Sequence, residues 1–241
     1  MKSMVYVIAS IILNLTSVSL ADPPVEPIYI YGSQPGEGTL DQGEDGGNPF
    51  ASAFVYLLTH EILTSDDFRS IIINRTLEKS WGLQYPDISS SIDRELWQFL
   101  PLSSADRRIA LVVVFSDYTN AGTTSLPGAR HDLDRISQAL SITGFEVHTT
   151  IDPDQSQLNS ILTEFSERSR ASDIAVVYTT GHGVEVEGTI YLLPGDYPFI
   201  HGQSQLNARA VRLERIGGAV QASKANLVFY GGCRNNPFDE Y

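Results

Sequence analysis

The chain has 241 residues and a formal net charge of −13 at pH 7, with 16 Lys and Arg against 29 Asp and Glu. This excess of negative charge argues against nucleic acid as a partner and against adhesion to anionic membranes, because both rest on clustered cations. The 42% of hydrophobic residues is ordinary for a folded protein and too high for a disordered acidic tail. We therefore expect an acidic, folded protein with one core.

The first residues have the order of a secretory signal peptide. Lys2 is followed by an apolar run over 5–15 and then by small residues up to Ala21. The run is too short to span a bilayer comfortably, which makes an uncleaved anchor the less favoured alternative. We expect residues 1–21 to be removed and the mature protein, 22–241, to be exported to the periplasm or the medium without a stable membrane anchor.

The N-terminal part of the mature chain predicts mainly helices and loops. The elements expected there are a strand over 28–31, a Gly-rich acidic loop over 32–48, helices over 49–63 and 66–77, an edge strand over 96–100 and a linker over 101–107. Asp66 is expected to cap the second helix.

The remainder of the chain alternates strands and helices more plainly. The expected strands are 109–115, 145–150, 174–178 and 225–230, the expected helices are 129–140, 155–169 and 211–222, and a hairpin is expected over 185–193. This alternation predicts an α/β fold with a mostly parallel central sheet and helices on both faces. In such sheets the functional residues lie in loops at the carboxyl ends of the strands.

Two of these strand ends carry reactive side chains. The strand over 174–178 leads into Gly181-His182-Gly183, and the last strand leads into Cys233, the only cysteine of the chain. If the two strands are parallel neighbours, the imidazole and the thiol emerge at the same edge of the sheet, where the base can activate the nucleophile. The backbone amides of Gly183 and Cys233 could then hold the oxyanion of an acyl-transfer reaction.

The stretch from Ile109 to Phe238 resembles the large-subunit region of bacterial caspase-like and metacaspase peptidases. The matching motifs are Ala110-Leu111-Val112, Ala129-Arg130-His131-Asp132, Gly181-His182-Gly183, Tyr191-Leu192-Leu193-Pro194-Gly195-Asp196 and Cys233-Arg234-Asn235-Asn236-Pro237-Phe238. The distance of about 50 residues between His182 and Cys233 is also typical of caspases. The resemblance implies a caspase–hemoglobinase three-layer sandwich in which His182 is the base and Cys233 the nucleophile of a cysteine endopeptidase.

Motifs similar to those of the family's small subunit precede this region instead of following it. They are Ile30-Tyr31-Gly32-Ser33-Gln34-Pro35-Gly36, Leu40-Asp41, Gly46-Gly47-Asn48-Pro49-Phe50 and Gln84-Tyr85-Pro86 with Ser89-Ser90-Ser91. We interpret the chain as a circular permutant with a single caspase-like domain. Its small-subunit-like part is 27–100, its linker is 101–107 and its large-subunit-like catalytic part is 108–241. No cut between the two parts would then be needed for activity.

The resemblance also implies a preference for Arg or Lys before the scissile bond. Asp132 matches a pocket carboxylate of the family, although a salt bridge on the helix face is the alternative. Asp41 lies in the loop that lines the pocket in relatives, together with Thr39 and Leu40. The chain departs from the family at Gly231-Gly232, where relatives have Asp-Ala, so one pocket carboxylate is missing. A catalytically impaired binding module is therefore the alternative to an active endopeptidase.

No cofactor or metal set is expected from the spacing of His, Cys and carboxylate residues. Asp41, Glu44 and Asp45 could hold a calcium ion, but they lack the ligand spacing of a dedicated loop, which favours a solvated turn. The expected partner is a peptide or protein substrate, and the resemblance to metacaspases favours a monomer. Trp81 and Trp97 are expected to pack in the small-subunit layer. The histidines expected at the surface or in loops are His131, His148 and His201.

Overall fold

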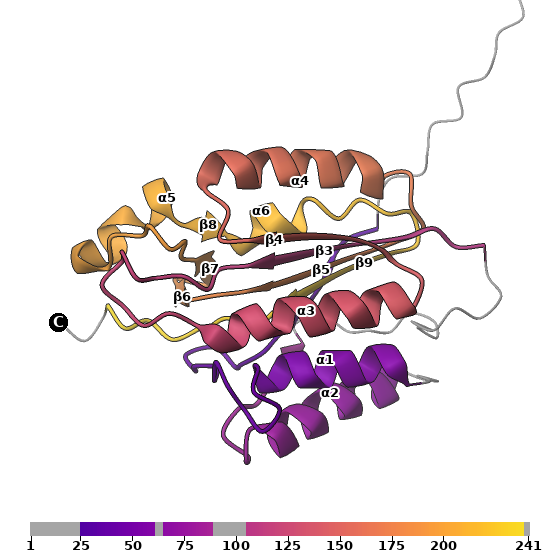
Figure 1. Cartoon of the computed structure of the whole chain (residues 1–241), viewed down its shortest axis with the longest axis horizontal. Helices are drawn as coiled ribbons and strands as arrows, with labels where there is room; N and C mark the ends of the chain where they lie inside the picture. Colours follow the sequence, from indigo (N-terminus) through magenta and orange to yellow (C-terminus); the bar gives the residue numbers. More distant parts are fainter. Residues whose placement is uncertain (1–24, 61–64, 89–104, 239–241) are drawn as a thin grey trace, which may run out of the picture.

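The computed structural model describes residues 25–60, 65–88 and 105–238 (Figure 1). Several expectations fall on other parts of the chain and lie outside the described residues. These are the signal peptide over 1–21, positions 61–63 of the expected first helix, the motif Ser89-Ser90-Ser91, the edge strand over 96–100 with Trp97, and residues 101–104 of the linker. The first helix was predicted too long, because it ends at Thr59 and His60 is extended.

The centre of the molecule is a six-stranded sheet with the order β2-β1-β9-β5-β3-β4. Its strands are β1 (Ile28–Tyr31), β2 (Asp87–Ile88), β3 (Arg108–Val114), β4 (Glu146–Ile151), β5 (Ile174–Thr180) and β9 (Ala225–Tyr230). All neighbouring strands are parallel except β1 and β2, which are antiparallel. The strand from the N-terminal part, β1, thus pairs directly with the last strand of the chain.

Helices cover both faces of this sheet, as the alternation predicted (Figure 1). One face carries α1 (Pro49–Thr59), α2 (Ser65–Lys79) and α3 (Pro127–Ile142). The other face carries α4 (Gln155–Ser169) and the short α6 (Leu213–Gly217). Each face has its own cluster of buried apolar side chains, so the sheet lies between two hydrophobic layers.

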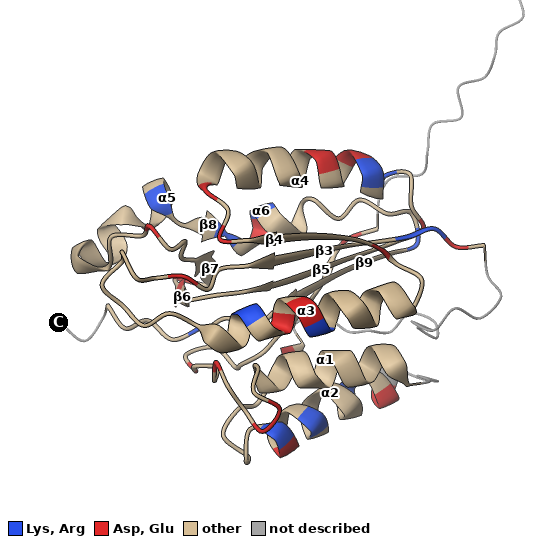
Figure 2. Ribbon diagram, viewed as in Figure 1, with Lys and Arg blue, Asp and Glu red and all other residues tan. Residues whose placement is uncertain are grey.

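The central strands are buried because their sequences supply apolar residues on both faces. All seven residues of β3 are buried, and β5 and β9 carry no charged residue (Figure 2). The charged residues lie mainly on the helices and loops. The α4 helix is fixed at its start by Asp154, whose carboxylate accepts from the Gln157 N–H while the Gln157 side chain accepts from the Asp154 N–H.

A second, smaller sheet follows the histidine loop. It consists of β6 (Gly183–Val186), β7 (Thr189–Leu192) and β8 (Val211–Arg212), and it confirms the expected hairpin. The expected helix over 211–222 is wrong at both ends, because Val211 pairs with Leu192 in this sheet and α6 ends at Gly217. The connection between β7 and β8 holds a 3₁₀ segment, Phe199–Gln205, and α5 (Leu206–Arg209), which the sequence did not predict.

Trp81 does not pack in the core, contrary to expectation. It follows the end of α2 in a left-handed conformation with φ of 55°, and its side chain is 65% exposed. The following residue, Gly82, donates its N–H to the Leu77 carbonyl and closes the helix at this turn. Asp66 lies within the first turn of α2, which begins at Ser65, and is not the residue before the helix. Within the described ranges, no helix is both long and apolar enough to cross a membrane.

Candidate active site

The two strands that precede His182 and Cys233 are parallel neighbours, and Thr179 of β5 lies beside Tyr230 of β9. Both loops therefore leave the sheet at the same edge. They also contact each other, because a Cβ atom on Gly183 would lie 1.8 Å from the Tyr230 hydroxyl oxygen and 2.9 Å from the Cys233 carbonyl oxygen. Only glycine permits this approach of the two loops.

His182 is partly buried, and its ring is held in one orientation. Its Nε2 atom lies 2.8 Å from the Thr124 carbonyl oxygen, and its ring makes edge contacts with Tyr118 and Phe199. A carbonyl oxygen can only accept, so the neutral imidazole carries its proton on Nε2. This hydrogen bond leaves Nδ1 as the nitrogen that can accept a proton.

The Tyr118 hydroxyl holds the loop that carries His182 through two hydrogen bonds. It accepts the backbone N–H of His182 at 2.9 Å and donates to the Leu193 carbonyl at 2.8 Å. Burial raises the pKa of Tyr118 well above its ordinary value, so the hydroxyl keeps the proton that it donates. The phenol thus connects the loop of the predicted base to the residue after β7.

Replacement of Tyr118 by phenylalanine is expected to lower the free energy of unfolding by about 1–3 kcal/mol, because it leaves the His182 N–H and the Leu193 carbonyl without a partner in a buried place. Urea denaturation of the purified variant measures this. The matched control is Tyr85→Phe, since the Tyr85 side chain is 50% exposed. Equal stability of the two variants would show that the Tyr118 hydroxyl does not support the loop.

Cys233 is partly buried, and its sulfur lies against Thr39. The Thr39 backbone N–H donates to Sγ at 3.3 Å, and the Thr39 hydroxyl oxygen lies 3.6 Å from Sγ. Among the described residues, no hydrogen bond joins the Cys233 sulfur to His182. The structure therefore brings the two loops together without a direct bond between the thiol and the imidazole, as occurs in free enzymes whose catalytic bonds tighten with substrate.

The predicted oxyanion donors, the amides of Gly183 and Cys233, lie on the two loops that meet. In the described part of the chain, the Cys233 N–H has no hydrogen-bond acceptor, whereas the Cys233 carbonyl accepts from the Tyr230 hydroxyl at 3.1 Å. Burial raises the pKa of Tyr230 well above its usual range, which keeps this donor protonated. The oxyanion role of both amides stays a prediction.

Asp132, predicted for the substrate pocket, is fully buried and paired within the protein. Its Oδ1 atom accepts from Arg135 at 2.8 and 2.9 Å, and its Oδ2 atom accepts from the Asn48 N–H at 3.2 Å and the Tyr178 hydroxyl at 3.4 Å. Burial raises the pKa of this carboxyl to about 7, and the Arg135 charge opposes the rise. The alternative role as a helix-face salt bridge is what the structure shows, and a pocket role stays a prediction.

Asp41 also has an internal role, at the beginning of α3. Its carboxylate accepts the N–H groups of Gly128 and Ala129, each at 2.9 Å. The neighbouring Leu40 donates its N–H to the Gln84 side chain at 3.0 Å. Sequence reasoning missed this helix cap because the carboxylate comes from a loop more than eighty positions earlier.

The acidic loop that could hold calcium has other partners in the described residues. Lys79 contacts the Glu44 and Asp45 carboxylates at 3.3 and 3.1 Å. Within the described ranges, no group of three or more His, Cys, Asp or Glu side chains is placed to hold a metal ion. Of the three histidines predicted to lie at the surface or in loops, His131 and His201 are exposed, and His148 is partly buried beside Glu146.

Two buried polar residues beside the nucleophile were not found from the sequence. Asn48 donates from its side chain to the Gly231 carbonyl at 3.0 Å, and only its position before Pro49 could have indicated a helix cap. Arg234, directly after Cys233, is 7% exposed and pairs with Asp87 and Glu185, at 2.8 and 2.7 Å. The N-terminal part of the chain therefore contributes contacts on both sides of the nucleophile.

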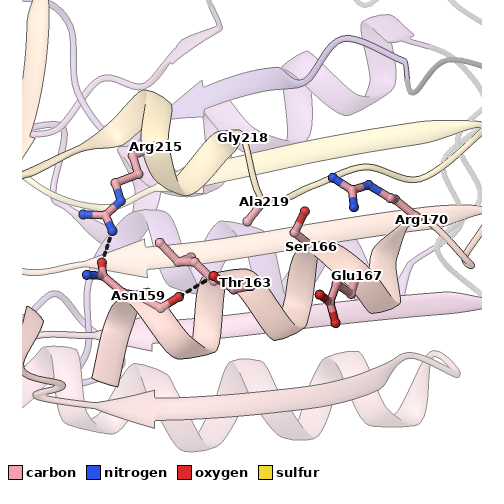
Figure 3. A pocket seen from close by; sticks show the side chains of 9 residues that line it. Asn159, Thr163, Ser166, Glu167, Arg170, Arg215, Gly218 and Ala219 are labelled. Atoms are coloured by element: carbon pink, nitrogen blue, oxygen red, sulfur yellow. Dashed lines mark hydrogen bonds between the residues drawn. The ribbon is translucent and has the colours of Figure 1, made fainter. Parts of the chain in front are cut away.

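A groove lies on the other face of the sheet, between α4 and α6 (Figure 3). It is lined mostly by polar residues, and at one end the Arg215 guanidinium donates to the Asn159 side chain. It contains none of the residues predicted for catalysis or substrate binding. We therefore do not assign the substrate to this groove.

The loops that carry His182 and Cys233 both lie in the part of the chain that matches a known family. The family model of the caspase domain matches residues 107–240, which is more than half of the chain. A search of curated proteins finds no match. The match confirms the resemblance to caspase-like peptidases and agrees with the α/β sheet and its two helical layers. The chain therefore belongs to the caspase-domain family of cysteine peptidases.

Proposed function

We propose that this protein is a cysteine endopeptidase in which His182 and Cys233 act as a dyad. The observation that carries the proposal is the parallel pairing of β5 with β9, which brings both loops to one edge of the sheet. The orientation of His182 supports it, because the Nε2 contact with Thr124 leaves Nδ1 able to accept the thiol proton.

The chemistry follows from these groups. The Cys233 thiol gives its proton to His182, and the thiolate attacks the carbonyl carbon of the scissile peptide bond. The oxyanion is stabilised by the Gly183 and Cys233 amides. When the C–N bond breaks, His182 returns the proton to the leaving amine, and a thioester remains on Cys233. Water then hydrolyses the thioester, with His182 as the base, and restores the thiol.

We also propose that the N-terminal part of the chain takes the place of the family's small subunit, as a circular permutant would require. The support is that β1 extends the sheet beside β9, in register from Ile28 with Leu227 to Tyr31 with Tyr230. The loop after β1 then reaches the Cys233 sulfur through Thr39. Export, after removal of residues 1–21, remains part of this proposal.

Cleavage after Arg or Lys is the finer part of the proposal, and it rests on Asp132 and Asp41. Both carboxylates are engaged by other groups, Asp132 by Arg135 and Asp41 by the N-terminus of α3. A basic substrate side chain would have to compete with these partners. The substrate panel below is therefore designed to compare basic with uncharged and acidic residues.

A non-catalytic binding module is the second candidate. The observation that favours it is the lack of a hydrogen bond between His182 and Cys233 in the described structure. At Gly231 an added Cβ would lie 2.8 Å from the Tyr178 hydroxyl. The aspartate that relatives carry at this position would therefore have little room beside the nucleophile.

The test is hydrolysis of fluorogenic peptides that end in Arg, Lys, Asp or Ala, with and without calcium, by protein lacking residues 1–21. The control is the same protein after alkylation with iodoacetamide, which can react with one cysteine only. We expect turnover that alkylation removes, fastest for Arg and Lys. Turnover confined to Asp or Ala peptides would contradict the basic preference, and no turnover by folded protein would favour the binding module.

A further inference from the structure

The Cys233 sulfur contacts three polar groups of one residue of the N-terminal part, Thr39. The Thr39 backbone N–H donates to Sγ at 3.3 Å, the Thr39 hydroxyl oxygen lies 3.6 Å from Sγ, and the thiol donates to the Thr39 carbonyl at 3.8 Å. A thiolate accepts hydrogen bonds more strongly than a thiol, so donors aimed at sulfur favour its ionised form. The contact is therefore of the kind that a nucleophilic cysteine needs.

The Thr39 hydroxyl has a second acceptor, which lets it respond to the state of the sulfur. In the structure it donates to the Gly231 carbonyl at 3.1 Å. That carbonyl also accepts from the Asn48 side chain at 3.0 Å. The hydroxyl can therefore turn toward the sulfur when the thiol loses its proton, and the Gly231 carbonyl keeps one donor. No buried acceptor is left unpaired by the rotation.

The segment that carries Thr39 is fixed on both sides. Before it, the Glu37 carbonyl accepts the Arg234 N–H at 2.9 Å. After it, the Leu40 N–H donates to Gln84, and Asp41 holds the first turn of α3 through Gly128. Because these anchors lie next to Thr39 in the chain, its backbone N–H is held toward the sulfur before any substrate binds, and its hydroxyl needs only to rotate about its C–O bond.

We propose that Thr39 stabilises the thiolate of Cys233 with its backbone N–H and its hydroxyl. In the step concerned, the thiol proton moves to His182, negative charge develops on Sγ, and the Thr39 hydroxyl rotates from the Gly231 carbonyl to the sulfur. No other bond changes. This role differs from the substrate-binding role that the family resemblance implied for Thr39. It rests on the proposed function in that Cys233 is taken as the nucleophile.

The test compares the alkylation rates of Cys233 with iodoacetamide at a fixed neutral pH in Thr39→Val and Thr39→Ser, followed by intact mass. Valine keeps the shape of threonine and lacks the hydroxyl, whereas serine retains it. Loss of the hydroxyl lowers the fraction of thiolate, while the thiolate that remains is the stronger nucleophile. These two effects partly offset each other, so we expect Thr39→Val to react about threefold to tenfold more slowly. Thr39→Ser is expected to react at the wild-type rate.

The matched control is Thr163→Val, on the exposed side of α4, where the hydroxyl donates to the Asn159 carbonyl of its own helix. It should alkylate at the wild-type rate. Thr39→Ala, which also lacks the hydroxyl, should repeat the slow reaction and serves if the valine variant has a lowered unfolding temperature. A wild-type rate in Thr39→Ala, or an equally slow Thr39→Ser, would overturn the proposal.

The alkylation assay needs no turnover, so it separates this inference from the proposed function. If peptides are hydrolysed, Thr39→Val should lower kcat about tenfold with KM unchanged, because the hydroxyl contacts the reacting sulfur and not the substrate. If peptides are not hydrolysed while Thr39→Val still slows alkylation, the peptidase proposal fails and the role of Thr39 stands.

Discussion

Replacement of Cys233 by alanine is expected to remove all measurable peptide turnover, and replacement of His182 by alanine is expected to lower kcat/KM by about 10²–10⁴-fold. The first change removes the only thiol of the chain. The second removes the Nδ1 acceptor that the Nε2 contact with Thr124 leaves free. Initial rates with the best peptide of the panel measure both effects.

His182→Ala gives the sharper test of the dyad, because it leaves a rate that can be measured. His201→Ala is the matched control, since this histidine is exposed on the 3₁₀ segment. A His182→Ala protein with more than about a tenth of wild-type kcat/KM would show that the imidazole is not the base.

Elements whose signals are local could be predicted from the sequence. The α4 helix has the predicted bounds, because its capping box and its apolar spacing are both contained in the segment itself. The central strands are within one or two residues of their predicted bounds, since continuous apolar runs are typical of strands buried on both faces.

Elements that depend on distant partners could not be predicted in this way. A helix was predicted over 211–222, but Val211 pairs with Leu192 and lies in a strand. The helix that remains ends at Gly217, where an added Cβ would lie 2.0 Å from the Tyr29 hydroxyl of β1. The sequence contains Gly217 and Tyr29, but no local pattern indicates that the tyrosine hydroxyl approaches this glycine.

The same distinction applies to the candidate site. The positions of His182 and Cys233 followed from the rule that parallel strands place their carboxyl ends at one edge. The contacts of Asp41 with α3 and of Thr39 with Cys233 join positions far apart in the chain, so no spacing indicates them. Asp132 and Arg135, in contrast, are three residues apart on one helix, and a salt bridge on the helix face was the alternative role predicted for Asp132.

Replacement of Asp132 by asparagine is expected to lower the free energy of unfolding by about 3 kcal/mol at pH 7, because the amide has one acceptor oxygen and leaves buried donors of Arg135, Asn48 or Tyr178 unpaired. The Asp132 side chain is 0% exposed and that of Arg135 is 16% exposed. Urea denaturation measures the change. Asp134→Asn, at an exposed position of the same helix, is the matched control and should change stability by less than about 0.5 kcal/mol.

The pH dependence of the stability lost in Asp132→Asn shows whether burial or the Arg135 charge dominates at this carboxyl. Burial raises the pKa of Asp132 to about 7 in the folded protein, whereas an aspartate in the unfolded chain has a pKa near 3.9. Between these values the folded state binds the proton and the unfolded state does not, so the wild type loses stability as the pH rises toward 7 and gains it as the pH falls. The asparagine variant has no such group. The difference in unfolding free energy between the wild type and this variant should therefore be larger at about pH 5 than at about pH 8. A difference that grows with pH would show instead that Arg135 dominates and keeps the carboxylate ionised.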